Sequence, residues 1–178
     1  GGVSLMALSL AACGSSDDTT ATTDTTTATD TADTTTTTPV TPAVPTAENK
    51  TLGTGVDTIA TGAGDDVINA GLDGANQTLG ALDTIDGGAG SDTVNIALAA
   101  SITPKSITNV ETVNVTSAAT TTLNMINSSG YTSISNTGTT DTITVSNINS
   151  AGVDLTVENT GNAQVFSWTA SALTGTAD

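Results

Sequence analysis

Histidine and arginine are absent from this chain, and Lys50 and Lys105 are its only basic residues. Without histidine the chain cannot form a Ser-His-Asp triad, a Cys-His pair or an HExxH zinc site. Binding to nucleic acids or anionic lipid surfaces relies on basic side chains that neutralise phosphates, and the formal net charge of −16 argues against both. The composition therefore indicates a protein that is not an enzyme and whose natural counter-charges are metal cations.

Aromatic residues make up only 2% of the 178 residues, which is few for a compact globular core. Many short runs of Val, Ile, Leu and Thr suit a thin core instead, in which each layer packs only on its neighbours, as in a repeat solenoid. Cys13 is the only cysteine, so no internal disulfide can form.

Residues 3–12 form an apolar run that is too short to span a bilayer as a helix. The run is typical of a secretory signal peptide, and it leads into Leu-Ala-Ala-Cys, which ends at Cys13. These residues resemble a bacterial lipobox, which implies cleavage before Cys13, acylation of this cysteine and anchoring in a membrane. The alternative is an incidental cysteine in an ordinary signal peptide. No initiator Met or basic segment precedes the run, so we expect a chain truncated at its start.

Residues 14–50 are of low complexity, and 14 of the 20 residues between Thr19 and Thr38 are threonine. Aspartates are interspersed among the threonines, and three prolines follow them. Such a segment has little to bury and repels itself, so it predicts a disordered, extended tether.

Residues 87–95 read Gly-Gly-Ala-Gly-Ser-Asp-Thr-Val-Asn, which matches the nonapeptide G-G-x-G-x-D-x-U-x, where U is a large aliphatic residue. Residues 61–69 match at every position but the first. Residues 52–60 and 78–86 directly precede these two segments in frame and keep the Asp and the aliphatic residue, although 78–86 lacks both expected glycines. The eight residues 70–77 interrupt the frame.

Each residue type in the nonapeptide has a physical reason. Glycine at the second and fourth positions permits backbone conformations that are costly for other residues, so the loop can turn its carbonyl oxygens toward a cation. The aspartate adds a charged oxygen, and calcium takes 6–8 oxygen ligands. The residues after the aspartate form a short strand whose aliphatic side chain points inward.

Residues 52–95 therefore resemble the hemolysin-type calcium-binding (RTX) repeat family. The resemblance implies a right-handed parallel β-roll in which each nonapeptide is half a turn, alternate nonapeptides stack on one side, and Ca²⁺ lies between their loops. The implied ligands are the carboxylates of Asp66 and Asp92 and the backbone carbonyls of Gly62, Gly64, Gly88 and Gly90, with Asp57 and Asp83 as second-rank ligands.

The pairing of these segments depends on residues 70–77. If they bulge out, 61–69 stacks on 87–95 and 52–60 stacks on 78–86; if they form a half-turn of their own, the pairing shifts. A Gly/Asp-rich turn array without metal is the alternative. Seven Asp and no basic residue between positions 51 and 95 argue against it, so we predict that calcium folds a module that is disordered without it.

Beyond residue 96, short apolar–polar alternations recur with turn residues between them. Their apolar anchors are 9–12 residues apart and are Val113, Leu123, Ile134, Ile143, Leu155 and Phe166. This spacing allows a β-sandwich of hairpins or a parallel solenoid with two strands per turn of about 21 residues. We favour the solenoid because the β-roll before it offers an open edge as a template. Residues 109–115 also resemble, more loosely, bacterial S-layer and large surface proteins.

The expected organisation is a signal segment over residues 1–13, a disordered linker over 14–50, a calcium β-roll over 51–96 and a truncated β-solenoid over 97–178. The expected function is that of a calcium-binding bacterial cell-surface protein, structural or adhesive, held at the outer membrane by a lipid on Cys13. Its expected partners are calcium, the membrane, and further copies or surface glycans and proteins. The alternative is the calcium-binding portion of a larger exported lipase or protease of the RTX type.

Overall fold

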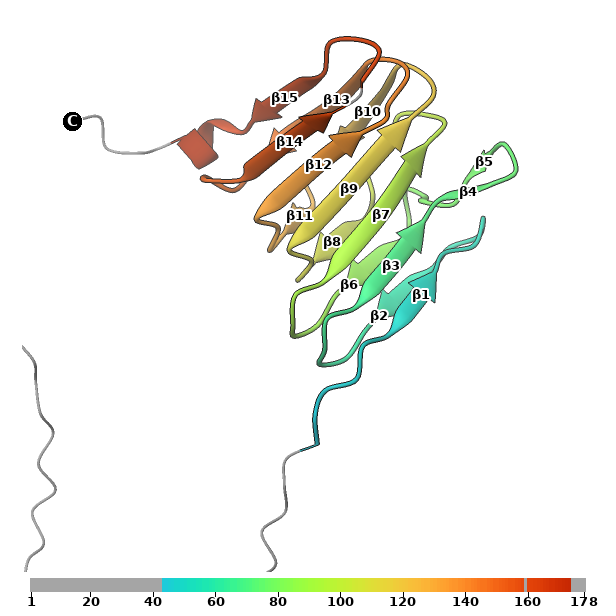
Figure 1. Cartoon of the computed structure of the whole chain (residues 1–178), viewed down its shortest axis with the longest axis vertical. Coiled ribbons are helices and arrows are strands. Elements are labelled where there is room, and N and C mark those ends of the chain that lie inside the picture. The colour runs from blue at the N-terminus through green and yellow to red at the C-terminus, as the bar shows by residue number, and fades with distance from the viewer. Residues whose placement is uncertain (1–42, 159, 174–178) are drawn as a thin grey trace, which may run out of the picture. The chain divides into compact units, whose positions relative to one another are not determined.

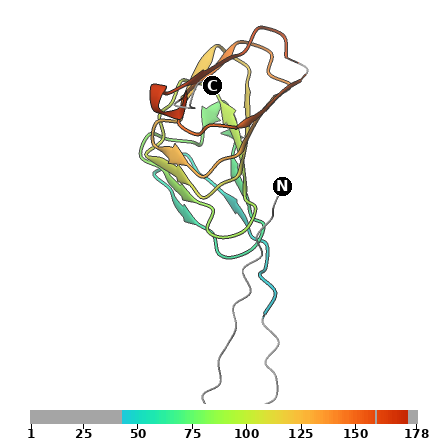
Figure 2. The same ribbon diagram turned by 90° about the vertical axis from the view of Figure 1, so that its left-hand side faces the viewer.

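The computed structural model describes residues 43–158 and 160–173, and in these ranges the chain folds as a parallel β-solenoid of about six turns (Figure 1). The view turned by 90° shows the chain rising coil by coil from the end near residue 43 toward the C-terminal end (Figure 2). The described part contains no α-helix, and its one helical element is the 3-10 turn η1 (Ala170–Leu173). The prediction of an all-β solenoid is confirmed.

The strands are short and follow one another closely. Their bounds are β1 (Asn49–Thr51), β2 (Thr58–Ala60), β3 (Val67–Ala70), β4 (Leu72–Asp73), β5 (Asn76–Gln77), β6 (Thr84–Asp86), β7 (Thr93–Leu98), β8 (Ser106–Thr108), β9 (Thr112–Ser117), β10 (Thr121–Asn124), β11 (Ser128–Ser129), β12 (Ser133–Thr137), β13 (Ile143–Ile148), β14 (Asp154–Glu158) and β15 (Val165–Trp168).

Three parallel sheets form the sides of the coils. One sheet has six strands in the order β1-β3-β7-β9-β12-β14, the second has the order β11-β8-β6-β2, and the third has the order β10-β13-β15. The only antiparallel pair in the described part is β4 with β5. A β-sandwich of hairpins would be antiparallel throughout, so that alternative is excluded.

The length of the early coils follows the nonapeptide frame. Asn49 of β1 pairs with Val67 of β3, 18 residues further on, which is two nonapeptides. Val67 pairs in turn with Thr93 of β7, 26 residues further on. The extra eight residues are the insertion 70–77, which leaves the coil as the β4–β5 hairpin. The insertion therefore bulges out, and 61–69 stacks on 87–95, while β2 stacks on β6.

The later coils differ from the expectation of two strands per turn. Between β8 and β13 each turn carries three strands, one in each sheet. The third side begins where Ile102 bridges to Leu123 of β10. The sequence did not predict β8 or β11, and β11 is only Ser128–Ser129, because two serines carry no apolar signal of a strand.

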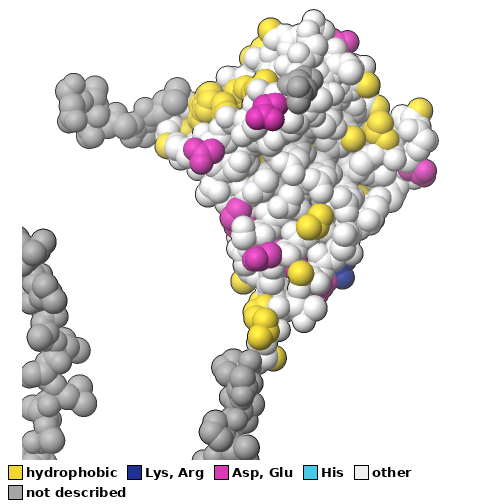
Figure 3. Space-filling model, in the orientation of Figure 1, with side chains coloured by type: hydrophobic (Ala, Val, Ile, Leu, Met, Phe, Trp, Pro, Cys, Tyr) yellow, Lys and Arg dark blue, Asp and Glu magenta, His cyan; other side chains and the backbone are white. Residues whose placement is uncertain are grey.

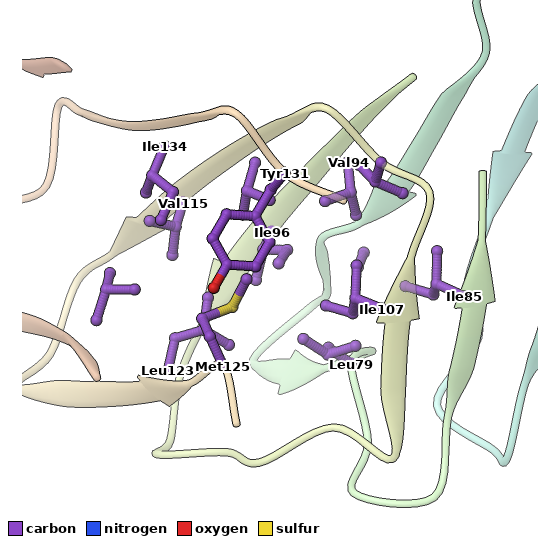
Figure 4. Close-up of a cluster of buried hydrophobic side chains, with 14 of the residues drawn as sticks. Leu79, Ile85, Val94, Ile96, Ile107, Val115, Leu123, Met125, Tyr131 and Ile134 are labelled. Atoms are coloured by element: carbon purple, nitrogen blue, oxygen red, sulfur yellow. The ribbon is translucent and has the colours of Figure 1, made fainter. Parts of the chain in front are cut away.

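The core is a column of inward-facing aliphatic side chains, with up to three from a single strand. Strand β7 alternates between half-buried and buried residues along its length, and β9 does so except at the exposed Thr116. Ile68, Val94, Val113 and Ile134 are in register on successive strands, and each is fully buried. Figure 4 shows how such side chains from several strands pack around Tyr131, the largest side chain in the core.

Matched substitutions test this column. Ile134 is fully buried, whereas Leu155, its partner on β14, is 37% exposed. We expect Ile134→Ala to reduce the free energy of unfolding by about 2–5 kcal/mol, because the neighbouring coils leave a cavity that cannot collapse. Leu155→Ala should cost clearly less. Urea unfolding of both variants measures the difference, and equal losses would contradict the assignment of the core.

An asparagine column on the outer face of the six-stranded sheet reinforces the stacking. The Nδ2 atoms of Asn69, Asn95 and Asn114 each donate to the Oδ1 of the preceding member, starting from Asn49, at 2.8–3.0 Å. One amide per coil thus links four coils in register, in addition to the backbone bonds of the sheet.

The domain boundaries expected from the sequence do not coincide with breaks in the structure. β1 lies at the end of the expected 14–50 linker, and its Lys50 occupies the inward register position held by Ile68 in the next coil. A lysine on this edge strand disfavours pairing of the sheet with an edge strand of another chain. β7 runs across the expected boundary at residue 96 without interruption. The predictions for Cys13 and for residues 14–42 lie outside the described residues.

Candidate metal centre

The two best-matching nonapeptides form stacked loops immediately before β3 and β7. Ala89 N donates to Gly62 O at 3.0 Å, and Gly64 N donates to Ala89 O at 2.8 Å. The carbonyls of Gly62 and Gly64 point at the Cα atoms of the loop above, since a Cβ on Gly88 would lie 2.2 Å from Gly62 O and a Cβ on Gly90 2.1 Å from Gly64 O. The loops therefore stack as closely as two backbones can.

Gly88 and Gly90, in the loop before β7, are required both by the limited space and by the backbone conformation. Gly88 has φ 85° and Gly90 has φ 143°, both in the region that disfavours residues with a side chain. We expect Gly88→Ala to lower the free energy of unfolding by at least about 2 kcal/mol, since strain and clash add. Gly55→Ala is the matched control, because no atom lies within 4 Å of its Cβ position. Thermal unfolding of the two variants checks this, and similar melting temperatures would refute it.

Four acidic residues occupy the same place in successive coils, directly before the strands of the six-stranded sheet; we call them the carboxylate column. They are Glu48, Asp66, Asp92 and Glu111, which precede β1, β3, β7 and β9. The last three carboxylates each accept the backbone N–H of the acid one coil earlier: Glu48 N donates to Asp66 Oδ1 at 2.5 Å, Asp66 N to Asp92 Oδ1 at 2.8 Å, and Asp92 N to Glu111 Oε2 at 2.7 Å.

The two central members of the carboxylate column are buried with one oxygen left over. Asp66 and Asp92 are each 1% exposed, and the Oδ2 of each is buried without a hydrogen-bond partner. Burial raises the pKa of Asp92, and the nearby charges of Asp66, Glu111 and Asp65 raise it further, although the N–H bond from Asp66 opposes them. An ionised carboxylate is costly to bury unless hydrogen bonds, a paired charge or a bound cation compensates it.

The described residues supply little positive charge near the carboxylate column. The only ion pair among them joins Lys50 Nζ to Glu48 Oε2 at 2.6 Å, at one end of the carboxylate column. Figure 3 shows acidic side chains along the edge of the six-stranded sheet where its strands begin, and a single basic side chain on the same face. Asp66 Oδ2 and Asp92 Oδ2, which have no hydrogen-bond partner, are therefore oxygens to which a hard cation could bind.

The corresponding acids before β2 and β6 are arranged differently. Asp83 is fully buried, but its Oδ1 accepts the N–H of Asp57 at 2.9 Å and its Oδ2 accepts the N–H of Gly80 at 2.6 Å. Asp57 Oδ2 accepts the N–H of Gly53 at 2.9 Å. The next coil has Lys105 in this place. Because hydrogen bonds already satisfy Asp83, the geometry favours Asp66 and Asp92 as cation ligands over Asp57 and Asp83.

Within residues 43–158 and 160–173, no three His, Cys, Asp or Glu side chains gather closely enough to hold a metal ion by themselves. A cation here would combine the carboxylates of Asp66 and Asp92 with backbone carbonyls. Gly62 O already accepts one N–H, and a carbonyl oxygen has a second lone pair to offer. All the available donors are oxygens, the set that Ca²⁺ prefers.

Two members of the carboxylate column, Glu48 and Glu111, were not predicted from the sequence. Glu48 precedes Asp66 by 18 residues, and Glu111 follows Asp92 by 19. The spacing of two nonapeptides could have indicated Glu48, whereas Glu111 lies in a coil without the motif.

Comparisons of the chain with protein-family models, with curated proteins and with solved structures found no match. No helix long and apolar enough to cross a membrane occurs in the described ranges.

Proposed function

We propose that the loops before β3 and β7 bind calcium, and that the bound ion stabilises the first coils of the solenoid. The observation that carries the proposal is the pair of buried, unpartnered Oδ2 atoms on Asp66 and Asp92. A calcium ion would take these oxygens together with carbonyls from Gly62, Gly64, Gly88 and Gly90. It would compensate two charges that the fold otherwise buries without a counter-ion.

The experiment that tests calcium binding is isothermal titration calorimetry on protein freed of metal with a chelator. We expect a saturable heat with a dissociation constant of about 10⁻⁴–10⁻³ M, the range of many extracellular calcium modules. Asp66→Asn should weaken the binding strongly, whereas Asp154→Asn should not, because Asp154 is exposed on β14. Equal binding by the two variants would contradict the proposed ligands.

The wider proposal is a calcium-ordered structural or adhesive protein of the bacterial cell surface. Its support is the combination of a long parallel solenoid, which presents extended side faces, with the lipobox-like segment expected to end at Cys13. Solenoids of this type commonly use such faces to contact other macromolecules. The partner on those faces would be a further copy of the chain, a surface glycan or another surface protein.

Membrane anchoring has its own test. In cells expressing the chain behind its native leader, we expect the mature protein in the membrane fraction and Cys13→Ala in the soluble fraction, because the acyl chains supply the membrane affinity. Immunoblots of the two fractions measure this. Ser15→Ala, two residues away, is the control and should stay with the membrane. An unchanged distribution for Cys13→Ala would show that the cysteine is not the anchor.

A further inference from the structure

The outer face of the six-stranded sheet is uncharged over four neighbouring strands. The outward positions of β3, β7, β9 and β12, which alternate with the buried ones, hold only Thr, Ser, Asn, Ala and Val. Figure 3 shows no charged side chain over the middle of this face, and acidic side chains along its edge. On a chain with a formal net charge of −16, a ligand can approach this face without meeting a carboxylate.

A groove of about 180 Å³ runs along the solenoid axis on this face, and three successive coils contribute to each of its sides. The residues are Asn69, Asn95 and Asn114 of the asparagine column on one side, and Gly71, Ala97 and Thr116 on the other. Ala97 pairs with Thr116 in the sheet, and its smaller side chain leaves the groove open at its centre. Typical small-molecule pockets have about 300–1,000 Å³, so this groove suits a segment of an extended chain better than a compact ligand.

The asparagine column keeps unused hydrogen-bonding groups along this groove. Asn95 Nδ2 donates to Asn69 Oδ1 at 3.0 Å, and Asn114 Nδ2 donates to Asn95 Oδ1 at 2.9 Å. A primary amide has a second N–H, and its oxygen has a second lone pair. The column therefore fixes the orientation of each amide and still offers a donor and an acceptor in each coil. These groups repeat at the separation of neighbouring strands, about 4.7–4.9 Å.

The size of the uncharged face argues against a second copy of this chain as its partner. Strands of four to six residues, four of them about 4.8 Å apart, present on the order of 400 Å². A specific interface between proteins takes about 800 Å² from each partner. Contact between two such faces would also bring the acidic edges of two copies together.

We propose that this groove binds a linear, neutral polysaccharide that lies along the solenoid axis with one sugar residue per coil. Sugar hydroxyls donate and accept hydrogen bonds, as the unused amide groups of the asparagine column do. In an extended β-1,4-linked chain the sugar residues repeat at nearly the separation of the strands, so successive sugars meet successive amides. The inference rests on the proposed surface function and names the class of its partner.

One short segment of polysaccharide should bind weakly. The three aromatic residues of the chain lie elsewhere, since Tyr131 is in the core and Phe166 and Trp168 belong to β15 of another sheet. Without an aromatic ring on which sugars can stack, a few hydrogen bonds correspond to a dissociation constant of about 1 mM. A long polysaccharide that contacts several copies of the protein binds more tightly through multivalency.

An NMR titration of the ¹⁵N-labelled full chain with cellotetraose, a neutral β-1,4-linked tetrasaccharide, in calcium-containing buffer tests this inference. We expect the side-chain amide signals of Asn69, Asn95 and Asn114 to shift along one saturable curve. The side-chain amide of Asn147, which donates to Asn124 Oδ1 at 2.8 Å in the three-stranded sheet, is the internal control and should not shift. An acidic tetramer of galacturonate should leave all of these signals unchanged.

Two variants should bind cellotetraose at least about fivefold more weakly, the loss expected for about one hydrogen bond. Ala97→Thr fills the centre of the groove with the side chain that its neighbour Thr116 carries, and Asn95→Thr removes the central amide. Ala60→Thr, at an exposed position of β2 in another sheet, is the matched control and should bind as the unmodified protein does. Far-UV circular dichroism verifies that each variant is folded.

Unchanged amide signals at concentrations several times the expected dissociation constant, or shifts that Ala97→Thr leaves unaltered, would overturn polysaccharide binding in this groove. Shifts of the same signals with protein concentration alone would identify a second copy as the occupant and would overturn it as well. Calcium binding is measured separately by calorimetry. A protein that binds calcium but not cellotetraose therefore overturns this inference alone and leaves the proposed calcium site intact.

Discussion

Calcium should raise the free energy of unfolding of this protein by about 2.7 kcal/mol per bound ion when its free concentration is 100-fold above the dissociation constant, because an ion that binds only the folded state stabilises it by mass action. The structural reason is the pair of buried oxygens on Asp66 and Asp92 that have no partner within the protein. In chelator, the same two carboxylates repel each other, and we expect the coils before β9 to unfold at a lower urea concentration than in calcium.

Urea unfolding followed by far-UV circular dichroism, in chelator and in about 10 mM calcium, measures this effect. The same concentration of magnesium is the control, since magnesium demands near-ideal octahedral geometry and sheds its water reluctantly. It should therefore shift the unfolding midpoint much less. A full β-sheet signal in chelator, with a midpoint that calcium leaves unchanged, would contradict calcium-dependent folding.

Asp92→Asn should change stability in opposite directions with and without calcium. Asn can still accept the N–H of Asp66 through its Oδ1, but it removes a charge that is buried between Asp66 and Glu111. In chelator the variant should therefore be more stable than the unmodified protein, by on the order of 1 kcal/mol. In saturating calcium it should be less stable, because it has lost one of the two proposed carboxylate ligands.

The pH dependence separates this charge effect from altered packing. The pKa of Asp92 is raised in the fold, mainly by burial, so the folded state holds its proton more tightly than the unfolded chain does. This carboxyl therefore penalises folding increasingly as the pH rises from its ordinary value of 3.8 through the raised folded value. Subtracting the stability of Asp92→Asn from that of the unmodified protein in chelator, across this range, should show the decline. A flat difference would show that the charge of Asp92 does not control the metal-free stability.

The nonapeptide frame predicted the first half of the structure in detail. Ile68, Ile85 and Val94 hold its aliphatic position and are all buried. The frame also fixed the 18-residue coil, because a pattern with a period of nine sets both the strand position and the loop position. Whether residues 70–77 stayed in the coil could not be decided from the pattern, since Leu72 and Leu79 offer apolar anchors to either arrangement.

The later coils were less predictable because some buried positions are polar. Asn136 on β12 is fully buried at the register position of Val115 on β9. Its Nδ2 donates to Gln164 Oε1 at 2.9 Å, and its Oδ1 accepts the hydroxyl of Thr139. An asparagine in an inward position is tolerated only because these partners, up to 28 residues away, are brought to it by the stacking. No local pattern encodes such a match.

The sequence predicts the candidate site only in part, because here too the hydrogen-bond partners depend on how the coils stack. Asp66 and Asp92 follow from the motif, but Asp57 and Asp83 fit the same pattern and the structure satisfies Asp83 with two N–H donors. Glu111 shares the place of Asp92 without sharing the motif. The difference between these acids is one of hydrogen-bond partners, which depend on how coils of unequal length stack.

An anomalous difference map from crystals grown in calcium would show where the ion binds. We expect a peak between the loops before β3 and β7, with carboxylate oxygens of Asp66 and Asp92 at the calcium–oxygen distance of about 2.3–2.6 Å. A map without a peak there at saturating calcium, or with peaks only at exposed acids such as Asp154, would contradict it.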